Sequence, residues 1–555
     1  NVRLSINNFL SGRLILVTLF AGLAALALHY ADSKREIFLD FSWNLLLLGF
    51  WARVAAFIPE AQPSPFALGW SEGSRLYNAS LFDALALYGQ KLPLPVLHPS
   101  RYLMQAIPYF LGVQSILVHR IWQIALWLVM TGLGAWLLAK RVAGGLKLPV
   151  LWVSLFFSLF FFQGAVYYHL MLVVILVLLG YSKNKPWQTL LFVLVASVWA
   201  GISRVNWWPV PALLAASLYL LDTPFEQGKV FKYLRWPFLW AISGGTLALA
   251  TNRAYIALSG NDPTLFNSAF TSGLLWERLF PNATFFLGIL PAILLVCLPL
   301  AYLVIHQKAF RRIHWLRRLG LLIILAAFFL GGLVVSVKIG GGGDLHNMDG
   351  FLVLFALIAS SLIAGAFEVD RHLEGAILSS QPHPVWLMLL VLIPVAFAFM
   401  HSNYWNFSNT AGQEKSLAQL NASLDLLKNQ PGEVLFISER QLLSFHQVPG
   451  VSIVADYEKV FLMEMAMGNN EAYLQGFYDA LQSHRFKAII SDPISTTYQD
   501  KSRSFSEENN AWVTHVVIPM LKYYQPAASW EDGEVNLLIP IGQESLLAQI
   551  QQLQQ

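Results

Sequence analysis

Long apolar segments recur along the chain as far as residue 401, and short polar loops separate them. A helix needs roughly 20 apolar residues to cross the hydrocarbon core of a membrane, and fewer where neighbouring helices cover it. By this measure the pattern predicts about twelve membrane-spanning helices. The expected spans are 14–30, 37–58, 117–139, 149–163, 166–181, 188–202, 205–221, 236–256, 284–305, 319–337, 351–368 and 384–401.

The chain changes character after residue 401. Charged and amide residues become common there, and the apolar runs shrink to strand length. Strands that alternate with helices are typical of a small α/β domain. We therefore expect a membrane domain over 1–401 and an α/β domain over 402–555. The expected strands are 433–438, 451–455, 486–491 and 535–540, with helical spacing in 457–484 and 507–523.

The composition narrows the class of protein. Hydrophobic residues make up 56% of the chain and charged residues 12%, whereas an average globular protein is about a quarter charged. This excludes an ordinary cytosolic enzyme and indicates an integral, multi-pass protein of the cell membrane. The net charge is +4, but the basic residues lie in short loops, so they indicate membrane topology and not a nucleic-acid partner.

Lysine and arginine in short loops mark the cytoplasmic side of a membrane. Four loops are rich in these residues and are expected on that side: 140–147, 182–187, 222–235 and 306–318. Counting spans then places three other loops and the C-terminal domain outside the cytoplasm: 59–116, 257–283 and 338–350. The N-terminus stays open, because basic residues lie both before the first span and after it. If the first group is cytoplasmic, 14–30 or 37–58 is not a full span.

Glu72 follows an apolar segment at the start of a polar loop, and Arg75 lies one helical turn later. Charged groups at the mouth of a membrane bundle are costly to bury and are usually functional. A carboxylate can act as a general base towards a hydroxyl or amine. Alternatively, Glu72 and Arg75 pair with each other and begin the amphipathic segment 77–88, which is expected to lie at the membrane interface. His98 and Arg101 follow before the third span, and arginines suit bidentate contacts with phosphate.

A second polar loop carries four consecutive glycines at 340–343. Glycines permit tight turns and close approach of a ligand. Asp344, His346 and Asp349 supply oxygen and nitrogen ligands for a divalent metal, and Lys338 supplies a charge for a phosphate. The alternative is a flexible loop whose charges are merely solvated.

A third group of polar residues lies at the ends of predicted spans. Tyr168 and His169 open one helix, and Arg204 occupies a short turn from which it can reach an outward-facing cavity. The alternative for His169 is a hydrogen bond with a neighbouring helix. The chain has no Gly-x-Gly-x-x-Gly or Walker motif, so nucleotide binding is not supported.

The serial order of these pieces resembles the GT-C superfamily of polytopic glycosyltransferases, especially the protein O-mannosyltransferase and aminoarabinose transferase branch. The resemblance covers 37–221 well and the later spans loosely. The matching pieces are Ser71-Glu72, Ser80–Gly89, His98-Pro99, Phe110-Leu-Gly112, Arg120, Ala139-Lys140-Arg141, Val166-Tyr167-Tyr168 and Gly201-Ile-Ser-Arg204.

The resemblance implies a GT-C-like membrane fold and a sugar donor on a polyprenyl phosphate, reached from the membrane lipid. It implies inverting transfer on the extracytoplasmic side to an acceptor glycan, lipid or protein, with Glu72 as general base. Arg75, Arg101, Arg204 and Lys338 are expected to neutralise the leaving phosphate. The other expected site residues are His98, Tyr168, His169, Asp344, His346 and Asp349, with Asp344 and His346 as the ligands of any divalent metal.

One position departs from the family pattern. The first acid of the family, usually Asp, is Ser71 here. Either Glu72 works alone, or Asp344, Asp83 or Asp40 substitutes, or the chain is an inactive scaffold or binding subunit of a surface assembly. A transporter or lipid flippase is a third class, disfavoured because the sequence shows no paired halves.

Overall fold

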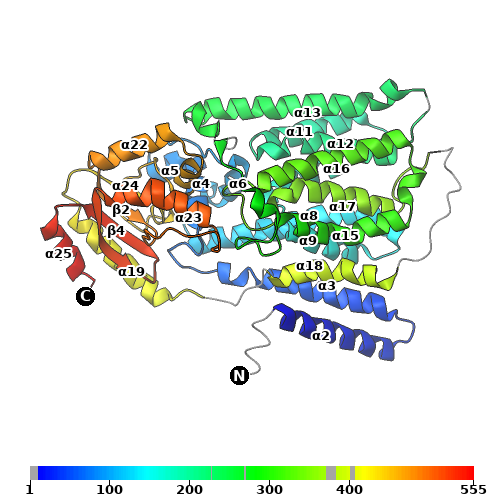
Figure 1. Ribbon diagram of the computed structural model, residues 1–555, viewed down its shortest axis with the longest axis horizontal. Helices are drawn as coiled ribbons and strands as arrows, with labels where there is room; N and C mark the ends of the chain where they lie inside the picture. Colours follow the sequence, from blue (N-terminus) through cyan, green and yellow to red (C-terminus); the bar gives the residue numbers. More distant parts are fainter. Residues whose placement is uncertain (1–9, 227, 268–270, 371–382, 401–406, 555) are drawn as a thin grey trace.

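The computed structural model describes residues 10–226, 228–267, 271–370, 383–400 and 407–554. A bundle of nearly parallel helices occupies most of the molecule, and a sheet domain covers one end of it (Figure 1). Each of the twelve predicted spans falls on a helix. These are α2 Leu10–Ala31, α3 Ile37–Ala55, α8 Ile116–Leu146, α9 Val150–Gln163, α10 Tyr168–Gly180, α11 Pro186–Gly201, α12 Val210–Asp222, α13 Val230–Leu258, α15 Ile289–His306, α16 Trp315–Ser336, α17 Asp349–Ile363 and α18 Pro384–Met400.

Among the described residues, six helical segments are long and apolar enough to cross a membrane, and α9, α10, α11 and α18 are shorter apolar helices. The short α9 is buried along almost its whole length. Such helices need not reach both surfaces, because their neighbours cover them. The chain is therefore an integral, multi-pass membrane protein.

The four basic loops lie together at the end of the bundle away from the sheet domain. Arg141 forms an ion pair with Asp222 at 2.5 Å. Asp370, which follows α17, pairs with Arg317 at 2.6 Å and accepts a hydrogen bond from the N–H of Phe225. The first two spans form a hairpin, and Ser42 of α3 accepts a hydrogen bond from Trp152 at the start of α9. The hairpin loop that carries Lys34 and Arg35 thus joins the basic end, and both α2 and α3 run along the bundle (Figure 1).

The sheet has four strands in the order β1-β2-β4-β3: β1 Glu433–Phe436, β2 Phe486–Ser491, β3 Tyr524–Trp530 and β4 Val535–Pro540. β1 and β2 are parallel, whereas β4 is antiparallel to β2 and β3. The predicted strand 451–455 is wrong, because this segment is irregular and Val454 packs under the sheet without pairing. The sequence also missed β3, whose Pro526 suits an edge strand because proline has no N–H to donate to a ladder.

Alternate residues of the strands face two cores. Val434 and Phe436 point to one core and Leu435 to the other, as the two-residue period of a strand requires. The first core is covered by α19 Thr410–Leu426 and α25 Glu544–Gln552. The second is covered by α21 Lys459–Met467, α22 Glu471–Gln482 and the helical stretch α23 Ser506–Trp512, η9 Val513–Val517 and α24 Ile518–Leu521.

Short helices fill the space between the bundle and the sheet domain: η1 Ile58–Glu60, α4 Glu72–Ser80, η2 Leu81–Asp83, α5 Ala84–Tyr88, α6 Pro99–Gln105 and α7 Ile107–Phe110. The apolar face of α4 packs against α6 and against Phe445, just after α20 Gln441–Ser444 of the sheet domain. Hydrogen bonds reinforce this junction: Ser74 donates to Glu458, and the hydroxyls of Tyr88 and Ser444 lie 2.7 Å apart. The junction thus buries the segment in which the sequence placed its first candidate residues.

Candidate functional site

Glu72 is buried at the first turn of α4, where Arg120 of α8 holds both of its carboxylate oxygens. Nε of Arg120 donates to one oxygen and Nη2 to the other, each at 3.0 Å, and the backbone N–H of Leu68 adds a third hydrogen bond. Burial by itself disfavours the charged carboxylate, but the charge and hydrogen bonds of Arg120 outweigh it and lower the pKa of Glu72. Glu72 is thus a fixed carboxylate with little capacity to take up a proton.

Arg120 also fixes the chain that enters the loop. Its guanidinium donates to the backbone carbonyls of Gln62, Ser64 and Phe66 at 2.6–2.9 Å. The pairing of Glu72 with Arg75 that the spacing suggested is not formed as an ion pair, because Arg120 occupies the carboxylate and Nη1 of Arg75 donates to Ser71. A buried ion pair with further hydrogen bonds imposes one geometry on its surroundings.

Glu60, at the end of η1, is a second acid at this place. Its strongest charged neighbours are Arg75 and then Arg53. Within the described ranges its side chain forms no hydrogen bond and no ion pair within 4.0 Å. Glu60 is therefore a half-buried carboxylate whose oxygens are not engaged by any side chain in the described part of the chain. The sequence carried a signal for it, since an acid that directly ends an apolar span needs the same explanation as Glu72.

Two of the predicted phosphate-binding arginines meet on the ring of Tyr167. The guanidinium carbon of Arg101 lies 4.8 Å from the ring centroid, and that of Arg204 lies 4.9 Å from it. A cation over an aromatic face is attracted by the ring quadrupole. Tyr167 comes from the turn between α9 and α10, so a ring outside the predicted site residues brings together arginines that are far apart in the sequence.

Arg204 has partners on the glycine-rich loop and the start of α17. It donates to Oδ1 of Asn347 at 3.2 Å and lies 3.7 Å from Oδ2 of Asp349. Asp349 is fully buried and accepts a hydrogen bond from the indole of Trp207 at 2.9 Å. These contacts hold the turn that carries Arg204 against the glycine-rich loop, and the buried Asp349 carboxylate provides a counter-charge for Arg204.

His98 lies close enough to the cations for their charges to act on its imidazole. Burial, followed by the charges of Arg204 and Arg101, holds its pKa well below its ordinary value, and Lys338 acts on it in the same direction. Its backbone φ of 50° places it in the left-handed region, which a side chain adopts only when its surroundings impose it. His98 is thus a neutral imidazole at pH 7, available as a donor or an acceptor.

The glycines of 340–343 allow protein groups, not an open ligand space, to come close. A Cβ on Gly343 would lie 2.5 Å from the carbonyl oxygen of Thr284, and one on Gly342 would meet the ring of His346 at 2.6 Å. Glu508 of the sheet domain accepts a hydrogen bond from the N–H of Gly340 at 2.8 Å and one from Arg278 at 2.7 Å. The loop is therefore bonded to the sheet domain through Glu508, which counts against the alternative of a loop whose charges are merely solvated.

Asp344 and His346 contact each other at 2.5 Å. Both lie near Arg101 and Arg204, because the charges of all four residues influence the Tyr167 hydroxyl. In the part of the chain that the structure describes, no group of three or more His, Cys, Asp and Glu side chains is arranged to hold a metal. Asp349 instead accepts a hydrogen bond from Trp207 and lies within ion-pair distance of Arg204. Among the described residues this loop therefore does not form a metal site with three protein ligands, and a metal held by Asp344 and His346 stays a prediction.

Tyr168 and His169 are buried at the inner side of the cluster. The Tyr168 hydroxyl and both ring nitrogens of His169 have no hydrogen-bond partner among the described residues. The ring of His169 therefore does not bond a neighbouring helix as the alternative supposed; its backbone carbonyl accepts from Trp199 at 2.7 Å. Polar groups of this kind are usually satisfied when buried, so they mark a place that favours a polar ligand.

The structure thus brings most of the predicted residues together. Arg101, Arg204, Lys338, Asp344 and His346 lie around His98 and Tyr167, and we call these seven residues the cation cluster. Arg75 lies between this cluster and the acids Glu60 and Glu72. Its positive charge influences both the Tyr168 hydroxyl and the Glu60 carboxylate. Glu72 does not belong to the cation cluster, and the charge of Arg75 connects the two.

Asp40, one proposed substitute for the missing acid, does not reach the cluster. It pairs with Arg35 at 2.7 Å at the basic end of the bundle. The fold and the cluster together define an integral membrane protein with a cationic, aromatic-lined site between its helices and a small α/β domain.

No protein-family model matches the sequence. A search of curated proteins likewise finds no match. Among solved structures, the crystal structure of ArnT from Cupriavidus metallidurans in the apo state aligns with 90% of this chain and 98% of its own length, at 12% identity and a TM-score of 0.44. A TM-score this low does not by itself establish a common function.

Proposed function

We propose that the protein is a membrane glycosyltransferase that takes a sugar from a polyprenyl-phosphate donor and transfers it, with inversion, to an acceptor on the extracytoplasmic side. One observation carries the proposal. Arg75, Arg101 and Lys338 are half-buried cations at one end of a membrane bundle, and in the described residues none of them has an acid within ion-pair distance. Unpaired buried charge is costly, so such a site favours an anion from outside the protein.

A lipid phosphate suits this site on chemical grounds. Arginine guanidinium groups bind phosphate oxygens through charge-assisted hydrogen bonds. Positive groups that face a leaving phosphate stabilise the charge that develops as its bond to the sugar breaks. Because the cluster lies at the end of the spanning helices, the lipid chain of the donor can stay in the membrane while its phosphate reaches Arg101 and Arg204.

The acceptor needs a base to remove its proton. Glu72 stays a candidate for this role, but its carboxylate is occupied by Arg120, so the geometry favours Glu60 as the base and Glu72 as a positioning residue. The balanced step is a single displacement. The acceptor oxygen or nitrogen attacks the anomeric carbon, its proton passes to the carboxylate, and the bond to the phosphate oxygen breaks with its electron pair.

A direct test measures the binding of undecaprenyl phosphate to the full chain in lipid nanodiscs. Arg101→Gln and Arg204→Gln are each expected to weaken binding about tenfold or more, since hydrogen bonds to charged groups contribute roughly 1.5–3 kcal/mol. Arg503→Gln, an exposed arginine of the sheet domain, is the matched control. Equal affinity for undecaprenol and its phosphate would contradict the proposal.

The inactive scaffold remains a second candidate, because Ser71 replaces the family acid and Arg120 occupies Glu72. A scaffold can retain lipid-phosphate binding without transfer. Incubation with a polyprenyl-phosphate sugar distinguishes the two, since a transferase releases sugar slowly to water even when the acceptor is missing. No release above that of nanodiscs without the protein would favour the scaffold.

A further inference from the structure

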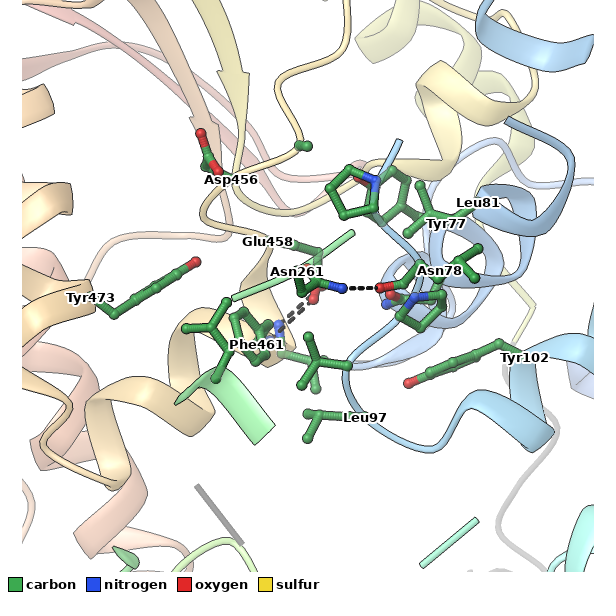
Figure 2. Close-up of a pocket in the computed structure, with 17 residues that line it drawn as sticks. Tyr77, Asn78, Leu81, Leu97, Tyr102, Asn261, Asp456, Glu458, Phe461 and Tyr473 are labelled. Carbon is green, nitrogen blue, oxygen red and sulfur yellow. Dashed lines mark hydrogen bonds between the residues drawn. The ribbon is translucent and has the colours of Figure 1, made fainter. Parts of the chain in front are cut away.

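A separate cavity of about 100 Å³ lies between the short helices and the sheet domain, with Tyr102 of α6 in its wall (Figure 2). A water molecule occupies on the order of 10–15 Å³ by the same measure, so the cavity has room for roughly seven to ten waters or one small polar molecule such as a monosaccharide. Its walls come from α4, from the proline-rich segment 93–97, from the turn at Asn261 and from 455–461 of the sheet domain. Both parts of the molecule are needed to form it.

Three polar side chains of the wall have unused hydrogen-bonding capacity. The amide nitrogens of Asn78 and Asn261 donate to the carbonyls of Ser74 and Leu94, and neither amide oxygen has a partner among the described residues. The hydroxyl of Tyr102 is likewise without a partner there, and Figure 2 shows it turned towards the cavity beside Leu97. Two acceptors and one group that both donates and accepts thus face the same space.

The charge of the wall excludes an anion. Its lining residues include no Lys, Arg or His, and they include Asp456 and Glu458. Both acids are already engaged: Glu458 accepts from Ser74 and from the N–H groups of Val460 and Phe461, and Asp456 lies 3.4 Å from Arg485. A cationic ligand would therefore compete with existing bonds, whereas a neutral hydroxyl would find free partners.

Aromatic rings supply the remaining surface. Tyr77, Tyr102, Phe461 and Tyr473 all line the cavity. Binding sites typically combine such apolar faces with a few placed polar groups. Rings that can pack against C–H groups, next to unused amide and phenol groups, suit a molecule whose C–H faces alternate with hydroxyls, which is the chemistry of a neutral sugar.

The cavity and the cation cluster lie on neighbouring residues of α6. Arg101 belongs to the cluster and Tyr102 to the cavity, and Tyr102 feels the charges of Arg101, Glu458 and Arg75. We propose that the cavity binds a neutral, hydroxyl-bearing sugar unit and is the acceptor site of the enzyme. Its role as acceptor site rests on the proposed function, whereas the binding of a neutral sugar does not.

The test is saturation-transfer NMR on the full chain in a sugar-free amphipol, because maltoside detergents carry the same chemistry as the ligand. The probes are the methyl glycosides of glucose, mannose and N-acetylglucosamine. Asn78→Leu and Tyr102→Phe are each expected to reduce the signal roughly threefold to tenfold, the effect of one hydrogen bond. Gln475→Leu, an exposed amide on α22, is the matched control and keeps the signal.

Tyr102→Phe keeps the ring and its packing, so loss of signal in that variant is not a folding defect. Unchanged signal in both cavity variants, or no signal for any of the three glycosides, would overturn the assignment. The glycoside measurement needs no donor lipid. The cavity proposal therefore fails or holds independently of the donor-phosphate proposal, which the undecaprenyl phosphate measurement decides.

Discussion

Arg120 of α8 donates a hydrogen bond to each carboxylate oxygen of Glu72, although 48 residues separate the two residues along the chain. The same guanidinium binds three backbone carbonyls of the segment that leads to Glu72. One arginine thus fixes both the entry to the extramembrane loop and Glu72. The predictions that follow separate this architectural role from the chemistry next to it.

Glu72→Gln is expected to destabilise the protein, because it leaves Arg120 buried without a counter-charge. Removing one partner of a buried ion pair costs roughly 3–5 kcal/mol. The measurement is thermal unfolding in nanodiscs, with Arg120→Met and the double variant completing a double-mutant cycle. A coupling energy near zero would show that the pair does not act as a unit.

Glu60→Gln is expected to abolish sugar transfer while leaving the unfolding temperature near that of the native chain. Its side chain forms no hydrogen bond in the described part of the protein, so an amide removes little that holds the fold. Loss of a general base slows a reaction by about 100-fold or more. If Glu60→Gln retains full transfer and a stable Glu72→Gln variant loses it, Glu72 is the base.

Glu439 is expected to make stability depend on pH. Burial raises its pKa to about 7, although the N–H of Ala67 and the amide of Gln441 partly oppose this. The folded state therefore binds the proton more tightly than the unfolded state, whose pKa is near 4.5. The resulting stabilisation is complete below that value and is lost as the pH rises to about 7.

The size of this effect is about 3 kcal/mol between pH 4 and pH 8, from about 1.4 kcal/mol per pKa unit. Glu439→Gln should remove this part of the pH dependence. Thermal unfolding at several pH values measures it, with the exposed Glu531→Gln as control. An unchanged pH profile in Glu439→Gln would show that Glu439 is ionised in the folded state.

Glu508→Gln is expected to loosen the glycine-rich loop, because the carboxylate of Glu508 joins the N–H of Gly340 to Arg278. Hydrogen–deuterium exchange over 336–348 should accelerate about tenfold or more, as expected from loss of charge-assisted hydrogen bonds. Glu507→Gln is a matched neighbour, since Glu507 lies 3.5 Å from Arg278 and does not bind the loop. Equal exchange in the two variants would contradict the coupling.

The membrane part of the fold was readable from the sequence, because lipid imposes a length and a polarity on every span. All twelve expected spans are helices, even short ones such as α10. In the sheet domain, the apolar runs of β1, β2 and β4 were also predicted. β3 was not, because pairing with β4 and not its own composition makes it a strand.

The candidate site likewise has features that the sequence predicts and features that only the folded structure determines. The sequence by itself identified the chemistry of Arg101, Arg204, Lys338 and His98, because charge near a membrane bundle needs a reason wherever it occurs. Only the tertiary structure decided that Arg101 and Arg204 meet on Tyr167, that Arg120 pairs with Glu72, and that Glu60 has no hydrogen bond or ion pair among the described residues. Residue type sets what a group can do, whereas contacts between distant segments decide which groups stay free to do it.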